Sequence, residues 1–286
     1  SVGANGPYTM EDLSVKFPEQ MEETRLKVRR DVRRSLAAAK HLIAAQVCFV
    51  LAMFLVKQSL SHFTPSGFMA SHALVSIPFI LALAKSDPDG GYDELKRSGR
   101  EFITSWYVVL LGALVFLGQL LLYLGLERVS VGNTAVLGQL VPVYSCTIAV
   151  FQGVEKPSWG KFVAIGAGVL GAAVMLDPAQ MWLSQGNLFL LARSAVFAAY
   201  LALQAPILQA YLPVTVAAAS QLVGASISIA VGIPLALHVG GLRAALGSLQ
   251  NGPITAWTSV VGVAALSAAA YTLTARAVRH TTPVVA

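Results

Sequence analysis

The chain alternates long apolar stretches with short polar connections. Each apolar stretch is about as long as a membrane crossing, because ~30 Å of hydrocarbon takes ~20 helical residues. A ninth and shorter stretch begins at Thr281, with Pro283 in its first helical turn, and reaches Ala286. The pattern predicts an all-α polytopic membrane protein. We expect eight complete crossings, at 38–59, 66–84, 104–125, 132–153, 160–176, 187–208, 213–237 and 255–276.

Composition agrees with this pattern. Hydrophobic residues make up 56% of the 286 residues and charged residues only 12%, with a mean hydropathy of +0.67, whereas soluble domains carry roughly 25% charged residues. The net charge of +6 does not indicate nucleic-acid binding, because eight of the twenty Lys and Arg residues precede residue 41 instead of covering a folded surface. We therefore expect the lipid bilayer, and no nucleic acid, as a partner.

The distribution of basic residues predicts the orientation. If residues 1–37 are cytoplasmic, that side of the membrane holds sixteen Lys and Arg residues and the opposite connections hold three. Short loops rich in Lys and Arg stay in the cytoplasm. We predict that loop 85–103 lies on the same side as the N-terminus and that residues 238–254 lie opposite. For the basic segment 1–37 two interpretations stay open: a helix along anionic lipid, or a solvated extension that enforces the topology.

An internal repeat relates the two parts of the chain. A shift of about 149 residues places the first crossing on the sixth, the second on the seventh and the third on the eighth. Residue identity is weak, and the stronger match is the order of long and short connections. Because a five-crossing repeat is odd-numbered, the second copy enters the membrane from the opposite side. We expect two inverted five-helix repeats, the second truncated after about eight to nine helices of the chain, and ten crossings in the intact protein. Such repeats are typical of secondary transporters.

One stretch of the sequence carries a family resemblance. Tyr123-Leu124-Gly125-Leu126-Glu127-Arg128-Val129-Ser130-Val131-Gly132-Asn133-Thr134-Ala135 is followed by Leu140-Val141-Pro142-Val143-Tyr144-Ser145, Glu155, Ile165-Gly166 and Gly171. This pattern resembles the EamA-type repeat of the drug/metabolite transporter superfamily, and Ala277-Val278-Arg279-His280-Thr281-Thr282-Pro283 looks like its truncated second copy. The expected parts are a basic cytoplasmic segment at 1–37, a first EamA-like repeat of five helices at 38–176 and an incomplete second repeat at 187–286.

The resemblance implies a ten-helix carrier or exporter with a central cavity lined by both halves. Members of the superfamily move amino acids, amines, nucleobases, sugar phosphates and nucleotide sugars, so the family does not fix the substrate. We expect transport of a small organic metabolite by an alternating-access secondary carrier. The alternative is a transporter-derived structural subunit of a larger membrane complex without transport activity. The plasma membrane and an organelle such as the plastid both stay open, as do membrane-protein partners and a homodimer.

Polar side chains inside the crossings are the candidates for substrate binding, because a polar group in hydrocarbon needs a protein partner or water. His72 in the second crossing corresponds to Gln221 in the seventh, and we expect both to face a mid-plane cavity between the first, second, sixth, seventh and eighth crossings. Arg193, the one Lys or Arg residue away from the ends of a crossing, either contacts an anion or reaches the outer headgroups. For each of the others a helix–helix hydrogen bond is the alternative. The candidate set is His72, Gln221, Gln46, Gln119, Tyr200 and Arg193.

Signatures of catalysis are absent from the sequence. Gly166-Ala167-Gly168-Val169-Leu170-Gly171 formally matches a dinucleotide fingerprint, but it lies in an apolar helix without a preceding strand. The sequence has no Walker loop and no nucleophile–base or metal-ligand cluster, and Cys48 and Cys146 lie in separate apolar stretches. No Asp or Glu lies within an expected crossing, so proton coupling through a buried carboxylate is not supported. We expect no enzyme, no cofactor and no metal site.

Overall fold

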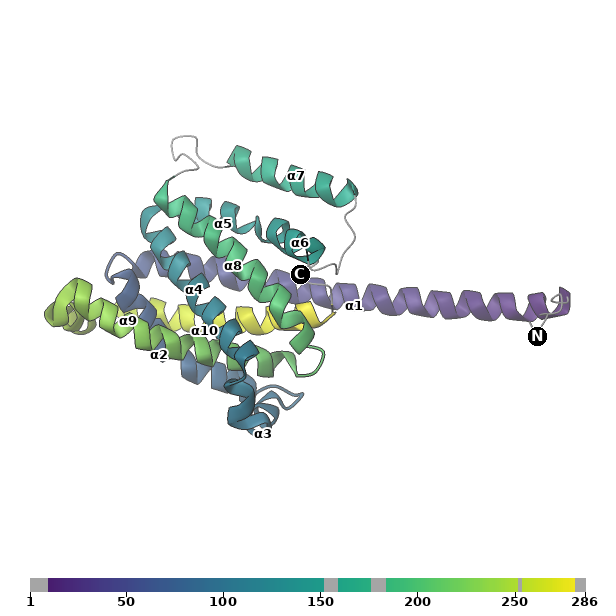
Figure 1. The fold of residues 1–286 in the computed structure, drawn as a ribbon, viewed down its shortest axis with the longest axis horizontal. Coiled ribbons are helices and arrows are strands. Elements are labelled where there is room, and N and C mark those ends of the chain that lie inside the picture. Colours follow the sequence, from purple (N-terminus) through teal and green to yellow (C-terminus); the bar gives the residue numbers. More distant parts are fainter. Residues whose placement is uncertain (1–9, 152–158, 176–183, 252–253, 281–286) are drawn as a thin grey trace.

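The computed structural model describes residues 10–151, 159–175, 184–251 and 254–280, and its described elements are all α-helices (Figure 1). Among the described residues, six helices are long and apolar enough to cross a membrane. They correspond to the first, second, third, sixth, seventh and eighth expected crossings. The helices are α1 (Met10–Ser59), α2 (Pro65–Lys85), α3 (Gly91–Ile103), α4 (Trp106–Arg128), α5 (Val131–Gly138), α6 (Val141–Phe151), α7 (Trp159–Met175), α8 (Gln185–Ile207), α9 (Pro213–Asn251) and α10 (Ile254–His280).

Hydroxyl side chains fix the starts of several membrane helices. Thr64 accepts a hydrogen bond from the backbone N–H of residue 67 at the start of α2, and Ser130 and Ser184 do the same at the starts of α5 and α8. Each bond satisfies one of the four N–H groups that the first turn of a helix leaves without a partner. These caps explain why the helices begin within two or three residues of the positions that hydropathy indicates.

The fourth expected crossing is not one helix, which corrects the sequence-based expectation. The chain leaves the helix at Gln139 and Leu140, between α5 and α6, where the two backbone N–H groups bond to carbonyls only three residues earlier, at 3.1 and 3.2 Å. Pro142 favours this break, because it has no N–H for the carbonyl of Gly138 and its ring would clash with that carbonyl in a continuous helix. The fifth expected crossing is α7, a helix of 17 residues.

The first helix also differs from the expected division of the chain. Backbone residues from Met10 to Ser59 form one continuous helix, and only its part from Ser35 has the length and hydropathy of a membrane span. Figure 1 shows that the N-terminal part of α1 extends beyond the bundle of the other helices. The basic segment is therefore a direct helical continuation of the first crossing.

The membrane helices pack in a regular set of pairs. Helix α1 packs against α10, α4 against α8, and α2 against α9, with further contacts of α4 with α9 and of α2 with α10. Two apolar clusters hold these pairs, one joining α2, α4, α8, α9 and α10 and the other joining α1, α2, α4 and α10. Helix α7 lies at the margin of the bundle, beside α5 (Figure 1).

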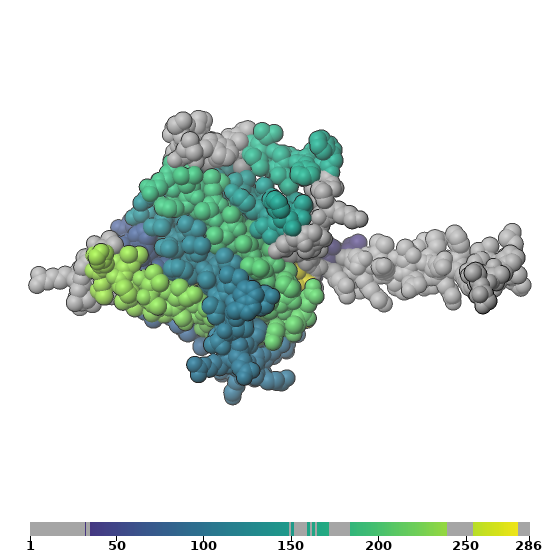
Figure 2. All heavy atoms as spheres, viewed as in Figure 1, coloured from purple at the N-terminus to yellow at the C-terminus, as the bar shows by residue number. Residues whose placement is uncertain are grey.

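Large apolar side chains cover the outside of the bundle, as expected for a chain in lipid. Phe54, Leu74, Trp106 and Leu188 are each about half exposed or more. Figure 2 shows one such face, on which residues of α4, α8 and α9 reach the surface. A soluble domain rarely presents so much contiguous apolar surface, so the exposed faces agree with a bilayer as the surrounding solvent.

Helices α4 and α9 approach each other closely at two glycines. A Cβ atom added to Gly224 would lie 3.0 Å from the backbone oxygen of Gly112, and one added to Gly112 would lie 3.0 Å from the backbone nitrogen of Gly224. Small residues allow this approach, which in lipid replaces the hydrophobic effect as the force between helices. The two parts of the chain thus approach backbone to backbone at this point, with the Val223 and Val115 side chains packed beside the glycines.

Candidate functional site

Four membrane helices surround a cavity near the middle of the bundle. Residues of helices α1, α4, α8 and α10 line this cavity, which is partly open. We call it the central cavity. Its aromatic and polar lining residues are Phe49, Gln119, Tyr123, Arg193, Phe197, Tyr200, Ser267 and Tyr271.

A second cavity adjoins the central one. It lies among α1, α5, α6, α8 and α10. We call it the side cavity. The break between α5 and α6 borders it, because Gln139 and Pro142 are among its lining residues. Four side chains line both cavities and form the wall between them, namely Phe49, Met53, Arg193 and Phe197.

Four aromatic rings form a cluster in the wall of the central cavity. Phe49 contacts Phe197 and Tyr271 edge to face, with ring centroids 5.7 and 5.6 Å apart. Tyr271 also meets Tyr200 at 5.7 Å and Phe197 at 6.1 Å. These are favourable geometries for aromatic pairs. The rings come from α1, α8 and α10, so the cluster joins helices from both parts of the chain.

Arg193 places a positive charge at this wall. Among the described residues, no hydrogen bond or ion pair to its guanidinium is found, and the electrostatic neighbours that act on it are Tyr123 and Tyr271. The Tyr123 hydroxyl is engaged elsewhere, with His72. The Tyr200 hydroxyl likewise bonds to Ser220, at 3.3 Å. The guanidinium therefore faces cavity space without a carboxylate beside it in the described part of the chain.

His72 and Gln221 line neither of these two cavities. The ring of His72 lies between the Ser267 hydroxyl, 3.1 Å from Nε2, and the Tyr123 hydroxyl, 3.2 Å from Nδ1. Because both partners line the central cavity, His72 stands directly behind its wall and ties α2 to α4 and α10. The Gln221 amide is buried and donates to the Ala217 carbonyl of its own helix at 3.2 Å.

The other sequence-derived candidates lie at the cavities. Gln119, Tyr200 and Arg193 line the central cavity, and Gln46 lines the side cavity together with Arg193. Sequence reasoning did not single out Tyr123, Ser267 and Tyr271. A signal was present: Tyr123 and Tyr271 lie inside apolar stretches, whereas tyrosine in membrane helices is enriched at the interfaces. A tyrosine away from the interface needs a polar neighbour or water, and here the cavity region provides it.

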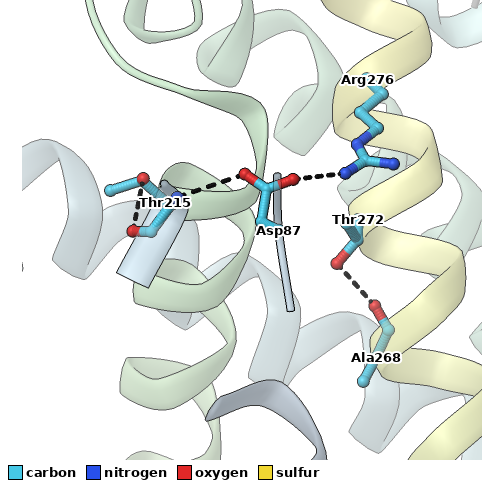
Figure 3. A network of polar contacts seen from close by, with 6 residues as sticks. Asp87, Thr215, Ala268, Thr272 and Arg276 are labelled. Atoms are coloured by element: carbon cyan, nitrogen blue, oxygen red, sulfur yellow. Dashed lines mark hydrogen bonds and ion pairs between the residues drawn. The ribbon is translucent and has the colours of Figure 1, made fainter. Parts of the chain in front are cut away.

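The predicted inner end of the bundle is closed by polar contacts (Figure 3). Asp87, at the end of α2, accepts a bond of 2.5 Å from the Arg276 guanidinium on α10 and one of 3.2 Å from the Gly91 N–H. The Thr215 hydroxyl on α9 donates to the Gly91 carbonyl at 3.1 Å. Nearby, Glu94 accepts from the backbone N–H of Leu212 at 2.9 Å. We call these contacts the inner latch; they join the α2–α3 region to α9 and α10.

The opposite end of the bundle is held differently. Phe63, after α1, meets Trp257 on α10 edge to face at 5.4 Å. The Lys57 ammonium donates to the backbone carbonyls of Leu126 and Val129, at 2.6 and 3.0 Å. These carbonyls end α4, where a cation is favoured by the helix dipole. Apolar contact and a cation on backbone carbonyls thus replace the ion pair of the inner latch.

Comparison with known proteins gives a family match for just under half of the chain. Residues 37–177 match the EamA-like transporter family, and no curated protein matches the chain. The matched range runs from the membrane part of α1 to the end of α7 and contains the motif residues from Tyr123 to Gly171 that carried the resemblance. That resemblance is therefore confirmed. With its membrane helices, this chain is an integral multi-pass membrane protein whose residues 37–177 match the EamA-like transporter family.

Proposed function

We propose that the chain is a secondary carrier that moves a small organic metabolite across its membrane by alternating access. The observation that carries the proposal is the central cavity, which lies near the middle of the helices and takes its walls from α1 and α4 and from α8 and α10. A binding site between two halves can be offered to each side of the membrane in turn when the halves rock against each other. The match of residues 37–177 to the EamA-like transporter family supports the same class of activity.

The packing of the helices supports the inverted repeat on which this mechanism depends. Under the 149-residue shift, α1 corresponds to α8, α2 to α9 and α4 to α10. Exchanging the halves maps the pair α1–α10 onto α8–α4 and the pair α4–α9 onto α10–α2. It maps the pair α2–α9 onto itself. All of these pairs are in contact. A two-fold pseudo-axis produces such an exchange. Because the repeat is odd-numbered, we infer that this axis lies in the membrane plane.

The inner latch supplies the element that would have to open. Its contacts connect helices of different halves across the inner end, so an inward-open state requires that the pair of Asp87 and Arg276 separates. Its hydrogen bonds are charge-assisted but few, which allows them to be exchanged for contacts with water. We infer that the described arrangement is the one in which access from the inner side is closed.

Transport by the purified full chain in liposomes tests the proposal. Vesicles loaded with an unlabelled compound should accumulate its labelled form by counterflow, with amino acids, nucleobases and phenylacetate as probes. Accumulation of at least one probe above that of protein-free vesicles is the expected result. A folded chain that exchanges none of them would contradict the proposal and support the structural-subunit alternative.

A crosslink at the latch tests the alternating-access step. The variant carries Asp87→Cys and Arg276→Cys in a background without Cys48 and Cys146, the two native cysteines, which are free thiols. Joining residues 87 and 276 with a reducible bifunctional thiol reagent should stop transport, and reduction should restore it. The two single-cysteine variants, treated alike, are the control. Unchanged transport by the crosslinked protein would show that the inner end does not open.

A further inference from the structure

The charge and the rings of the central cavity together point to a class of substrate. We propose that the carrier binds an aromatic carboxylate, with its carboxylate on Arg193 and its ring against the cluster of Phe49, Phe197, Tyr200 and Tyr271. This inference rests on the proposed carrier function and names the substrate of the same cavity. The runner-up ligands are neutral aromatic compounds, small aliphatic acids and phosphate esters.

The guanidinium of Arg193 needs a counter-charge. A guanidinium at membrane depth is costly unless it has a counter-charge or reaches the headgroups. Arg193 lies in the walls of both cavities, and in the described part of the chain no carboxylate neutralises it. A transported anion supplies the missing counter-charge each time it binds. A planar guanidinium also matches a carboxylate in geometry, with two parallel hydrogen bonds.

The number of charged side chains at the two cavities limits the charge of the ligand. The residues lining the two cavities include no further Lys, Arg or His beside Arg193, and no Asp or Glu. A carboxylate carries one negative charge and forms a neutral pair with one guanidinium. A phosphate monoester carries about −1.5 to −2 at neutral pH, so part of its charge would remain uncompensated in a poorly solvated cavity. The single arginine therefore selects a monoanion.

The aromatic rings of the central cavity favour a ligand that carries a ring. The aromatic cluster lies beside Arg193, since Phe197 shares the wall with it and Tyr271 is one of its electrostatic neighbours. Offset and edge-to-face contacts favour a flat ring on such a surface. Gln119 lines the same cavity and adds an amide for a polar substituent. A ligand with one carboxylate next to one ring satisfies the charge and the rings together.

Binding to the purified full chain in detergent tests the inference independently of transport. Four probes separate charge from ring: phenylacetate has both, phenylacetamide lacks the charge, acetate lacks the ring, and phenyl phosphate carries a second charge. We expect phenylacetate to bind at least about tenfold more tightly than each of the other three, as measured by calorimetry and by the ligand-induced rise in melting temperature. Equal binding of phenylacetamide, or no phenylacetate binding up to millimolar concentration, would overturn the proposal.

Substitutions then locate the charge. Arg193→Gln should weaken phenylacetate binding about 10- to 100-fold, the range expected for a lost charge-assisted contact, and should leave phenylacetamide binding unchanged. Arg193→Lys keeps the charge without the fork geometry and should lie in between. Arg128→Gln is the matched control, because Arg128 lies over the Phe189 ring at 5.3 Å and lines neither cavity. Equal losses in Arg193→Gln and Arg128→Gln would reject the assignment of the anion to Arg193.

The two proposals can fail separately. Binding of phenylacetate that depends on Arg193, without counterflow of any probe, would remove the carrier function and keep the anion site. Counterflow of a neutral metabolite, without phenylacetate binding, would keep the carrier and remove the anion site. Melting temperatures of all variants without ligand show whether a lost signal reflects a lost fold.

Discussion

Arg276 and Arg193 lie on helices of the second half, but only Arg276 has a carboxylate partner among the described residues. Arg276 at the inner end meets Asp87, whose side chain is 1% exposed, and Asp87 in turn accepts a bond from the α3 backbone. Arg193 lies deeper, in the wall between two cavities, without a carboxylate partner among the described residues. A charge that is paired within the fold is expected to stabilise it, whereas we expect the unpaired charge of Arg193 to lower stability. Residues that break a local rule in this way are expected at functional sites.

Loss of the latch arginine should have the largest effect. Arg276→Gln leaves the buried Asp87 carboxylate without its counter-charge, and an unpaired buried charge costs ~3 kcal/mol or more. We expect the unfolding free energy in mild detergent to fall by about 3 kcal/mol, measured by denaturant unfolding. Arg279→Gln, an exposed position on the same helix, is the control and should change little. Equal stabilities of the two variants would show that the ion pair does not hold the inner end.

Loss of the latch carboxylate should have a smaller effect. Asp87→Asn leaves the guanidinium, which is 32% exposed and can turn to water, and keeps an oxygen for the Gly91 N–H. We expect a loss of about 2 kcal/mol, typical of a hydrogen bond to a charged group. The double variant with Arg276→Gln should be less destabilised than the sum of the two, because each removes the same contact. Full additivity would contradict the coupling, and Asp89→Asn, exposed nearby, is the matched control.

Loss of the cavity arginine should have the opposite sign. Arg193→Gln removes an unpaired charge from the middle of the bundle, and we expect the unfolding free energy to rise by about 1 kcal/mol, in the range usual for relieving an unfavourable site. Thermal unfolding without ligand is the measurement. A clear fall in stability would mean that Arg193 holds the fold, and the contrast with Arg276 would disappear.

The outer cation should have the smallest effect. Lys57 donates to two carbonyls at the end of α4, and water can replace it there because the site is only part-buried. Lys57→Met keeps the apolar stem, so we expect a loss of less than about 1 kcal/mol. The same unfolding measurement applies. A loss as large as that of Arg276→Gln would show that backbone carbonyls hold a cation as firmly as a carboxylate does.

Most of the helical architecture could be predicted from the sequence, because lipid imposes length and hydropathy on each span separately. Span α2, expected at 66–84, is Pro65–Lys85. The break at Gln139 was missed, since hydropathy does not register the missing N–H of Pro142. The family is likewise readable from the motif between Tyr123 and Gly171, because its residues lie close together in the sequence.

The cavity residues were harder to predict because partners come from distant parts of the chain. Hydropathy marks His72 as a polar residue in a span, but it does not show that Ser267, 195 residues later, accepts or donates at its ring. The same holds for Asp87, which reads as a loop residue and is bound to Arg276 across 189 residues. Arg193 was identifiable because a lone charge in an apolar segment stands out without knowledge of the packing.

The contact between α4 and α9 at Gly112 and Gly224 bears on the turnover number of the proposed transport. Interdigitated side chains lock two helices into discrete arrangements, and a sliding helix must first disengage them. At these two glycines the Val223 and Val115 side chains lie nearest to the touching backbones, so few side-chain atoms have to disengage. Gly224→Ala should therefore lower the turnover number and leave the Michaelis constant unchanged, whereas Gly168→Ala, where an added methyl group meets no neighbouring atom, should change neither. In the proposed carrier, the turnover number then depends on a helix contact at Gly112 and Gly224, which line neither of the two cavities.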